Sequence, residues 1–130
     1  MNKRIIGIAA GALTAITLGT AAFAGLKQNM NVTYFPGAFL DVGYGFLGTA
    51  RNSPDNVQQL GCFSSGGSAT CSGTTAAGQS FSCSTSSATQ LAAIHSMTSD
   101  SYLLFGWDNA TGMCEFVYVR NMSYTPAKRP

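Results

Sequence analysis

The stretch GCFSSGGSATC, residues Gly61–Cys71, places two cysteines symmetrically about a pair of glycines. The glycines, Gly66 and Gly67, suit a two-residue primed turn, which needs positive φ angles and joins the strands of a β-hairpin. The register of such a turn sets Cys62 directly opposite Cys71. Cysteines that face each other in a non-hydrogen-bonded pair are close enough to form a disulfide. The stretch therefore predicts a hairpin closed by a cross-strand disulfide.

The other two cysteines, Cys83 and Cys114, complete an even set of four. In a small exported domain such a set indicates two disulfides, and four cysteines allow three pairings. We favour Cys62–Cys71 with Cys83–Cys114. The alternative joins Cys71 to Cys83 across the next turn, TTAAGQS at 74–80. A zinc site or a redox dithiol would need closely spaced ligands such as C-x-x-C, and the sequence has none.

The first 24 residues, MNKRIIGIAAGALTAITLGTAAFA, have the features of a secretory signal peptide. A basic start is followed by an apolar run and by an Ala-Phe-Ala cleavage pattern before Gly25. The apolar run is short and interrupted by threonines, whereas a transmembrane helix needs about 20 apolar residues. We expect cleavage before Gly25, a secreted or periplasmic location, and no membrane span in the mature chain.

The formal net charge of +2 comes from two basic residues of this leader, Lys3 and Arg4. Without them the basic and acidic residues balance: Lys27, Arg51, Arg120, Lys128 and Arg129 against Asp41, Asp55, Asp100, Asp108 and Glu115. A neutral, charge-poor chain lacks the basic patch that binds nucleic acids or anionic membranes, so the sequence argues against both partners. Residues 25–130 suit a single domain.

Sequence patterns predict one short helix among several strands. The helix is expected over 86–97, where Leu91 and Ile94 share a face and Ser86 or Ser87 can cap. Glycines in FLDVGYGFLGTARNSPD, residues 39–55, indicate a kinked strand or an ordered loop. The expected strands cover 30–35, 56–64, 68–75, 79–85, 99–108 and 113–124.

The last two strands form the most apolar hairpin, around the turn NATG at 109–112. Placing Trp107 opposite Met113 sets Leu104 opposite Phe116, and we expect both to be buried. The chain is then a mainly β domain: a small antiparallel sandwich or open barrel of five to seven strands, with one short helix and two disulfides.

Candidate chemistry is sparse. His95, the only histidine, could act as a base for a serine, but no G-x-S-x-G elbow is present. The cluster RNSPD offers Arg51, Asn52 and Asp55 to an anionic or sugar ligand, although the same letters are typical of a turn. Trp107 could stack on a sugar or belong to the core. The sequence names no catalytic residue, no metal ligand and no cofactor, and it favours a non-enzymatic role.

The segments ARNSPDNVQQLGC, DSYLLFGWD and GMCEFVYVRNMSYTPAK resemble a group of small exported bacterial proteins of unknown function. The resemblance covers about Ala50 to Lys128. It implies an exported single domain and brings no activity, cofactor or site residue with it.

Three functions fit these observations. A binding module of the cell envelope or the medium, with a glycan or protein ligand, fits best. A structural component that self-associates through sheet edges is the alternative. A small hydrolase is the third.

Overall fold

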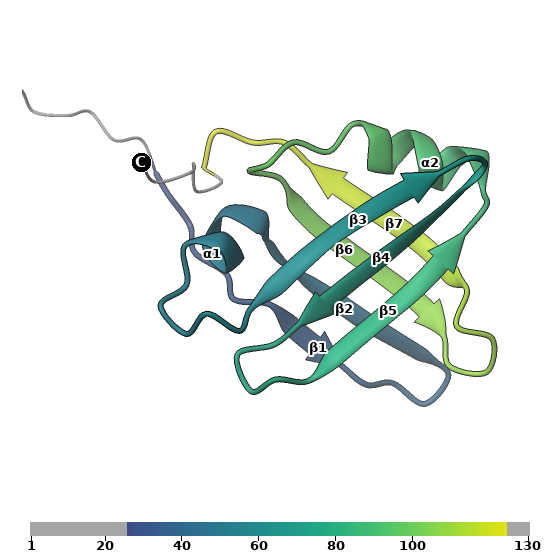
Figure 1. Cartoon of the computed structure of the whole chain (residues 1–130), viewed down its shortest axis with the longest axis horizontal. Helices are drawn as coiled ribbons and strands as arrows, with labels where there is room; N and C mark the ends of the chain where they lie inside the picture. Colours follow the sequence, from purple (N-terminus) through teal and green to yellow (C-terminus); the bar gives the residue numbers. More distant parts are fainter. Residues whose placement is uncertain (1–25, 125–130) are drawn as a thin grey trace, which may run out of the picture.

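The computed structural model describes residues 26–124, in which two antiparallel sheets face each other (Figure 1). The expected signal peptide lies outside these residues. The first sheet has the strand order β1-β2-β6-β7, with β1 at Thr33–Phe35, β2 at Leu40–Phe46, β6 at Tyr102–Asp108 and β7 at Cys114–Arg120. The second has the order β3-β4-β5, with β3 at Gln59–Ser65, β4 at Ser68–Thr74 and β5 at Ser80–Thr85. The mainly β sandwich agrees with the prediction.

Two short helices lie at opposite ends of β3 in Figure 1. The expected helix is α2, Ala88–His95, which buries Ile94 and begins at the N-cap position Ser87 without a side-chain capping bond. The other helix, α1 at Leu47–Arg51, was not expected. It is only five residues long, too short for a 3.6-residue repeat of apolar positions to stand out in the sequence.

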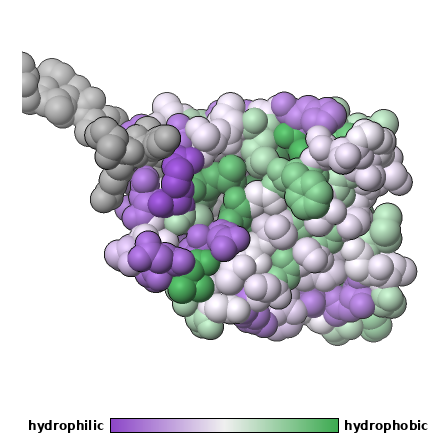
Figure 2. Space-filling model, in the orientation of Figure 1, coloured by the Kyte–Doolittle hydropathy of each residue, from purple (hydrophilic) through white to green (hydrophobic). Residues whose placement is uncertain are grey.

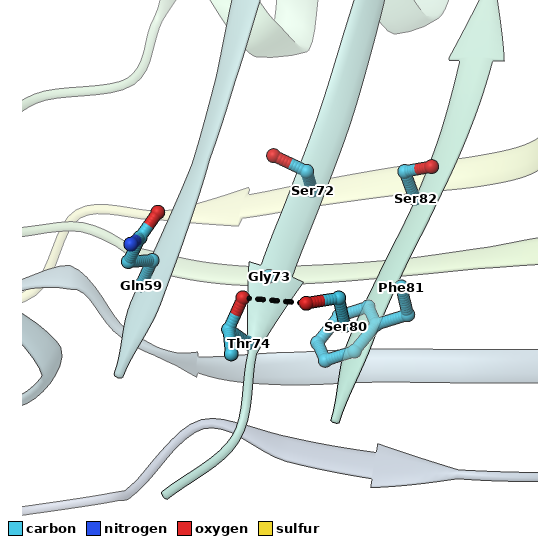
Figure 3. Close-up of a pocket in the computed structure, with 7 residues that line it drawn as sticks. All are labelled: Gln59, Ser72, Gly73, Thr74, Ser80, Phe81 and Ser82. Atoms are coloured by element: carbon cyan, nitrogen blue, oxygen red, sulfur yellow. Dashed lines mark hydrogen bonds between the residues drawn. The ribbon is translucent and has the colours of Figure 1, made fainter. Parts of the chain in front are cut away.

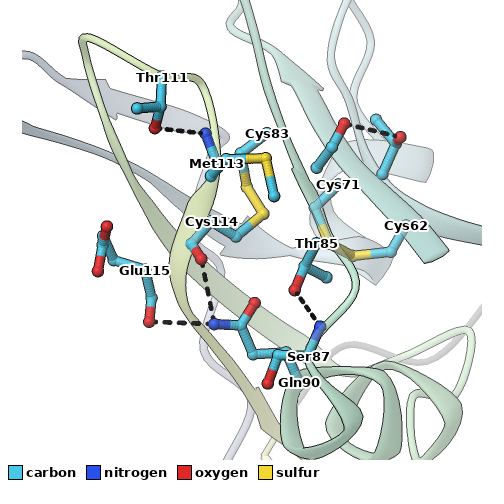
Figure 4. Close-up of a disulfide and its surroundings, with 12 residues drawn as sticks. Cys62, Cys71, Cys83, Thr85, Ser87, Gln90, Thr111, Met113, Cys114 and Glu115 are labelled. Atoms are coloured by element: carbon cyan, nitrogen blue, oxygen red, sulfur yellow. Dashed lines mark hydrogen bonds between the residues drawn. A yellow bond between two sulfur atoms is a disulfide. The ribbon is translucent and has the colours of Figure 1, made fainter. Parts of the chain in front are cut away.

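The hairpin around Gly66 and Gly67 forms with the predicted register, and Cys62 lies opposite Cys71. Both favoured disulfides are confirmed. Cys62–Cys71 crosses from β3 to β4 with a Cα–Cα distance of 4.0 Å. Cys83–Cys114 joins β5 of one sheet to β7 of the other, with a Cα–Cα distance of 5.2 Å (Figure 4). The second bridge therefore links the two layers covalently.

Residues 40–46 form one regular strand, β2, rather than a kinked strand or loop. The reason is packing: a Cβ added to Gly43 would lie 2.1 Å from the ring of Phe81, and one added to Gly73 on the opposite sheet would lie 2.4 Å from it. Glycines in a strand often mark such close approach. Here they make room for an aromatic ring between the sheets.

The core is built around Phe81. Its ring stacks on Tyr34 and Trp107 at centroid distances of 5.5 and 5.8 Å and is tilted against Phe105 at 5.7 Å. Phe105 and Leu103 are completely buried. The β6 side chains at 103, 105 and 107 all belong to this core, as a strand with alternating faces requires.

The predicted register of the β6–β7 hairpin was wrong. Trp107 lies opposite Cys114, and a β-bulge then shifts the register so that Phe116 lies opposite Gly106 and Leu104 opposite Tyr118. The bulge leaves Glu115 as the extra residue on β7. Leu104 and Phe116 are therefore not partners. Both are half-buried and point away from the core.

Candidate functional site

The outer side of the four-stranded sheet carries apolar residues where water-facing strands usually carry polar ones. Because side chains alternate along a strand and directly paired residues share a face, the core positions of β6 fix which residues point outward. Two neighbouring outward rows are involved. One contains Phe35, Val42, Gly106 and Phe116; the other contains Thr33, Tyr44, Leu104 and Tyr118.

We call the six large side chains of these rows the aromatic face: Phe35, Val42, Tyr44, Leu104, Phe116 and Tyr118. Phe35 is 65% exposed and Tyr118 48% exposed, and the other four are half-buried. Single exposed apolar side chains are ordinary, but a contiguous patch is typical of an interaction surface.

The ring of Phe116 lies over Gly106 and extends this face. A Cβ on Gly106 would lie 2.5 Å from the Phe116 ring, so the glycine gives the ring its place. The bulge at Glu115 brings Phe116 opposite this glycine. Sequence reasoning missed the surface because it assigned Phe116 to the core; the apolar residues on both sides of β6 and β7 were the available signal.

Charges lie at the two ends of the aromatic face. At one end the Arg120 guanidinium lies 5.6 Å from the ring centre of Tyr102 and 5.5 Å from that of Tyr118. Arg120 also donates a hydrogen bond to the Tyr124 hydroxyl, and this contact raises the pKa of Arg120, which stays charged. At the other end, Asp108 is paired with Leu40 and the exposed Glu115 lies in the bulge.

Two strand edges of the same sheet are poorly suited to pairing with another strand. The edge strand β1 has only three residues and is followed by Pro36. On β7, the side-chain amide of Gln90 donates to the backbone oxygens of Cys114 and Glu115, at 3.1 and 3.0 Å (Figure 4). The face of the sheet, more than these edges, is available to a partner.

Arg51 of the RNSPD cluster is bonded to a segment that is distant in the sequence. The Arg51 guanidinium donates to the Ser99 oxygen at 2.6 Å and forms a salt bridge with Asp100 at 2.7 Å. Arg51 also lines a cavity of about 280 Å³, together with Leu47, Ala50, Gln58, Gln59, Leu60 and Ser99. Neither Asn52 nor Asp55 lines it. A ligand role for Arg51, Asn52 and Asp55 stays a prediction.

Asp55 organises the turn before β3. Its carboxylate accepts hydrogen bonds from the Gln58 side chain at 2.6 Å, the Gln58 and Val57 backbone N–H groups, and the Ser53 hydroxyl. These bonds, that of the Gln58 side chain above all, lower the pKa of Asp55 from 3.8 to about 2.

Asp55 should therefore make stability depend on pH. A carboxyl group whose pKa is lower in the folded state stabilises the fold above its unfolded pKa and loses that contribution as pH falls. We expect the stability advantage of the wild type over Asp55→Asn, measured by urea unfolding, to be full at pH 6 and to fade between about pH 4 and about pH 2. A constant difference across that range would contradict the assignment.

Trp107, the fourth candidate, lies in the core and is 7% exposed. It stacks on Tyr34 at 5.9 Å as well as on Phe81. Tyr34 donates a hydrogen bond of 2.6 Å to Asp41, which lowers the pKa of Asp41 and raises that of Tyr34. In this conformation Trp107 presents little surface for a sugar to stack on.

The fold brings His95 next to a serine that sequence reasoning had not singled out. Nε2 of His95 lies 3.2 Å from the Ser64 hydroxyl, and both residues are exposed. Nucleophilic serines need a base that is itself oriented by a third group. Within residues 26–124 no carboxylate is hydrogen-bonded to His95, so the pair lacks that third group.

The opposite surface, the outer face of the three-stranded sheet, is rich in hydroxyls. Hydrogen bonds join Thr70 to Ser84 and Thr74 to Ser80. A cavity of about 380 Å³ lies on this sheet, lined by Gln59, Ser72, Gly73, Thr74, Ser80, Phe81 and Ser82 (Figure 3). Figure 2 shows this side, and most of it is neither strongly hydrophilic nor strongly hydrophobic.

Within residues 26–124, no group of three or more His, Cys, Asp or Glu side chains is placed to hold a metal ion. No helix in the same part of the chain is long and apolar enough to cross a membrane. Comparison of the chain with models of protein families, with curated proteins and with solved structures found no match.

Proposed function

We propose that the chain is an exported interaction module that binds a protein partner through the aromatic face. The observation that carries this proposal is the continuous pair of outward rows in which Phe35 and Tyr118 are widely exposed. Interface cores are enriched in tyrosine, phenylalanine and arginine and depleted of acidic residues and lysine, which matches this surface and its neighbour Arg120.

The two disulfides agree with the compartment that the proposal needs. Disulfides persist in oxidising environments, so both bridges indicate an extracellular or periplasmic location. Export directed by the expected signal peptide, with its removal before Gly25, would deliver the domain there. A rigid, doubly bridged sandwich also presents a preformed surface, which limits the entropy that binding costs.

The protein partner can be identified by site-specific photo-crosslinking in cells that produce the chain. Tyr118 is replaced by p-benzoyl-phenylalanine, and a matched probe replaces Phe63, which is 65% exposed on the opposite sheet. We expect a crosslinked protein product from position 118 and none from position 63. Equal yields from both positions, or no product from position 118, would refute a protein-binding role for the aromatic face.

The hydroxyl-rich sheet favours a second candidate function, binding of a neutral glycan. Its cavity of about 380 Å³ is lined by serines, a threonine and Gln59, with no charged side chain. Hydroxyl and amide groups suit a ligand that presents hydroxyls. Binding of neutral oligosaccharides that is lost in Gln59→Ala but kept in Tyr118→Ser would assign it to this sheet.

A further inference from the structure

We infer that the partner of the aromatic face is a second copy of this chain, packed about a two-fold axis that lies in the plane of the face and runs across the strands. This inference rests on the proposed function and specifies its occupant. It is carried by the order of the outward rows and by the charges at their two ends.

A two-fold axis across the strands places each outward row of one copy on a different row of the other copy. From one end of the sheet to the other, the outward rows contain Arg120, then Tyr118, then Phe116, then Asp108. A two-fold axis between the two central rows lays the Tyr118 row of one copy on the Phe116 row of the other. The interface is isologous, and each copy contributes the same six side chains.

The same rotation makes the charges complementary. It sets the Arg120 end of one copy over the end of the other copy that holds Asp108 and Glu115, and this happens twice by symmetry. An axis parallel to the strands would instead lay the Arg120 row on the Arg120 row of the second copy. Complementary charges at an interface rim select orientation, so they favour the axis across the strands.

The area of the aromatic face limits the expected affinity of the dimer. Three strands have seven residues and β1 has three. At about 3.3 Å per residue and about 4.8 Å per strand, the sheet covers roughly 380 Å². Both copies together then contribute roughly 760 Å² in flat projection, the size of a weak, transient interface. We therefore expect a reversible monomer–dimer equilibrium in the micromolar range rather than an obligate dimer.

Sedimentation velocity of the oxidised protein, from about 1 μM to about 1 mM, tests the inference. The wild type should shift from monomer to dimer over this range. Tyr118→Ser should weaken dimerisation at least tenfold, whereas Phe63→Ser on the opposite sheet should leave it unchanged. Arg120→Glu should also weaken it, and adding Glu115→Arg to that variant should restore most of the loss. Circular dichroism melts of each variant check that it is folded.

Each outcome of the sedimentation experiment supports or overturns the inferred dimer. A wild type that stays monomeric at 1 mM, or a dimer insensitive to Tyr118→Ser, overturns the second copy as occupant. A dimer that needs Tyr118 but is not restored by Glu115→Arg overturns the axis across the strands. If the wild type is monomeric while the probe at position 118 crosslinks a different protein, the proposed function stands and this inference fails.

Discussion

Phe81→Ala should lower the free energy of unfolding by about 3–5 kcal/mol, the usual cost of truncating a buried phenylalanine. Phe81 is 7% exposed and contacts Tyr34, Phe105 and Trp107 across the space between the sheets. A domain of this size is stable by only about 5–15 kcal/mol, so this loss removes a large fraction of the total stability. Urea unfolding under oxidising conditions measures the loss.

Phe63→Ala is the matched control. Phe63 lies on the same sheet but is 65% exposed, so its truncation should change the stability by less than about 0.5 kcal/mol. Losses from the two variants that agree within 1 kcal/mol would mean that Phe81 is not at the centre of the core.

Gly43→Ala probes the same contact from the other sheet. Its new Cβ would lie 2.1 Å from the Phe81 ring, and overpacking of this kind costs about 1–3 kcal/mol. In the Phe81→Ala background the methyl group enters the vacated space, and the cost should disappear. Gly61→Ala, where no atom lies within 4 Å of the new Cβ, is the control and should not destabilise the protein.

Replacing Cys83 and Cys114 by alanine should destabilise the protein more than replacing Cys62 and Cys71. The two bridges close chain segments of 31 and 9 residues. By restricting the unfolded chain, Cys83–Cys114 should add about 3.7 kcal/mol to the free energy of unfolding and Cys62–Cys71 about 2.6 kcal/mol.

The larger loss of stability expected without Cys83–Cys114 also has a structural reason. Cys83–Cys114 joins the two sheets, whereas Cys62–Cys71 joins neighbouring strands that are already paired by backbone hydrogen bonds. Urea unfolding of both double-alanine variants, with the wild type in the same buffer, gives the comparison. Equal losses, or a larger loss for Cys62–Cys71, would contradict the chain-restriction argument.

The dependence of the candidate site on tertiary structure is clearest at two residues. The sequence offers Trp107 for sugar stacking, but in the fold Phe81 of the second sheet and Tyr34 of the edge strand β1 cover it. Phe116 was expected in the core, and the bulge at Glu115 with the glycine at position 106 placed it outside. When both faces of a strand are apolar, the local sequence pattern does not show which face the other sheet covers. It does not show where a bulge changes the register either.

The sequence by itself determined the features that depend on neighbouring residues and on cysteine chemistry. Gly66 and Gly67 specify a turn whose register sets Cys62 opposite Cys71, and the even cysteine count indicates two bridges. The alternative pairing Cys71–Cys83 is excluded by the structure. Only the tertiary structure decided which face of the four-stranded sheet is the core. Phe81, from the other sheet, fills the space over Gly43 and thereby leaves Tyr118 and its row facing solvent. The physical reason is that turns and caps form within a few residues, whereas burial is settled between strands that are far apart in the chain.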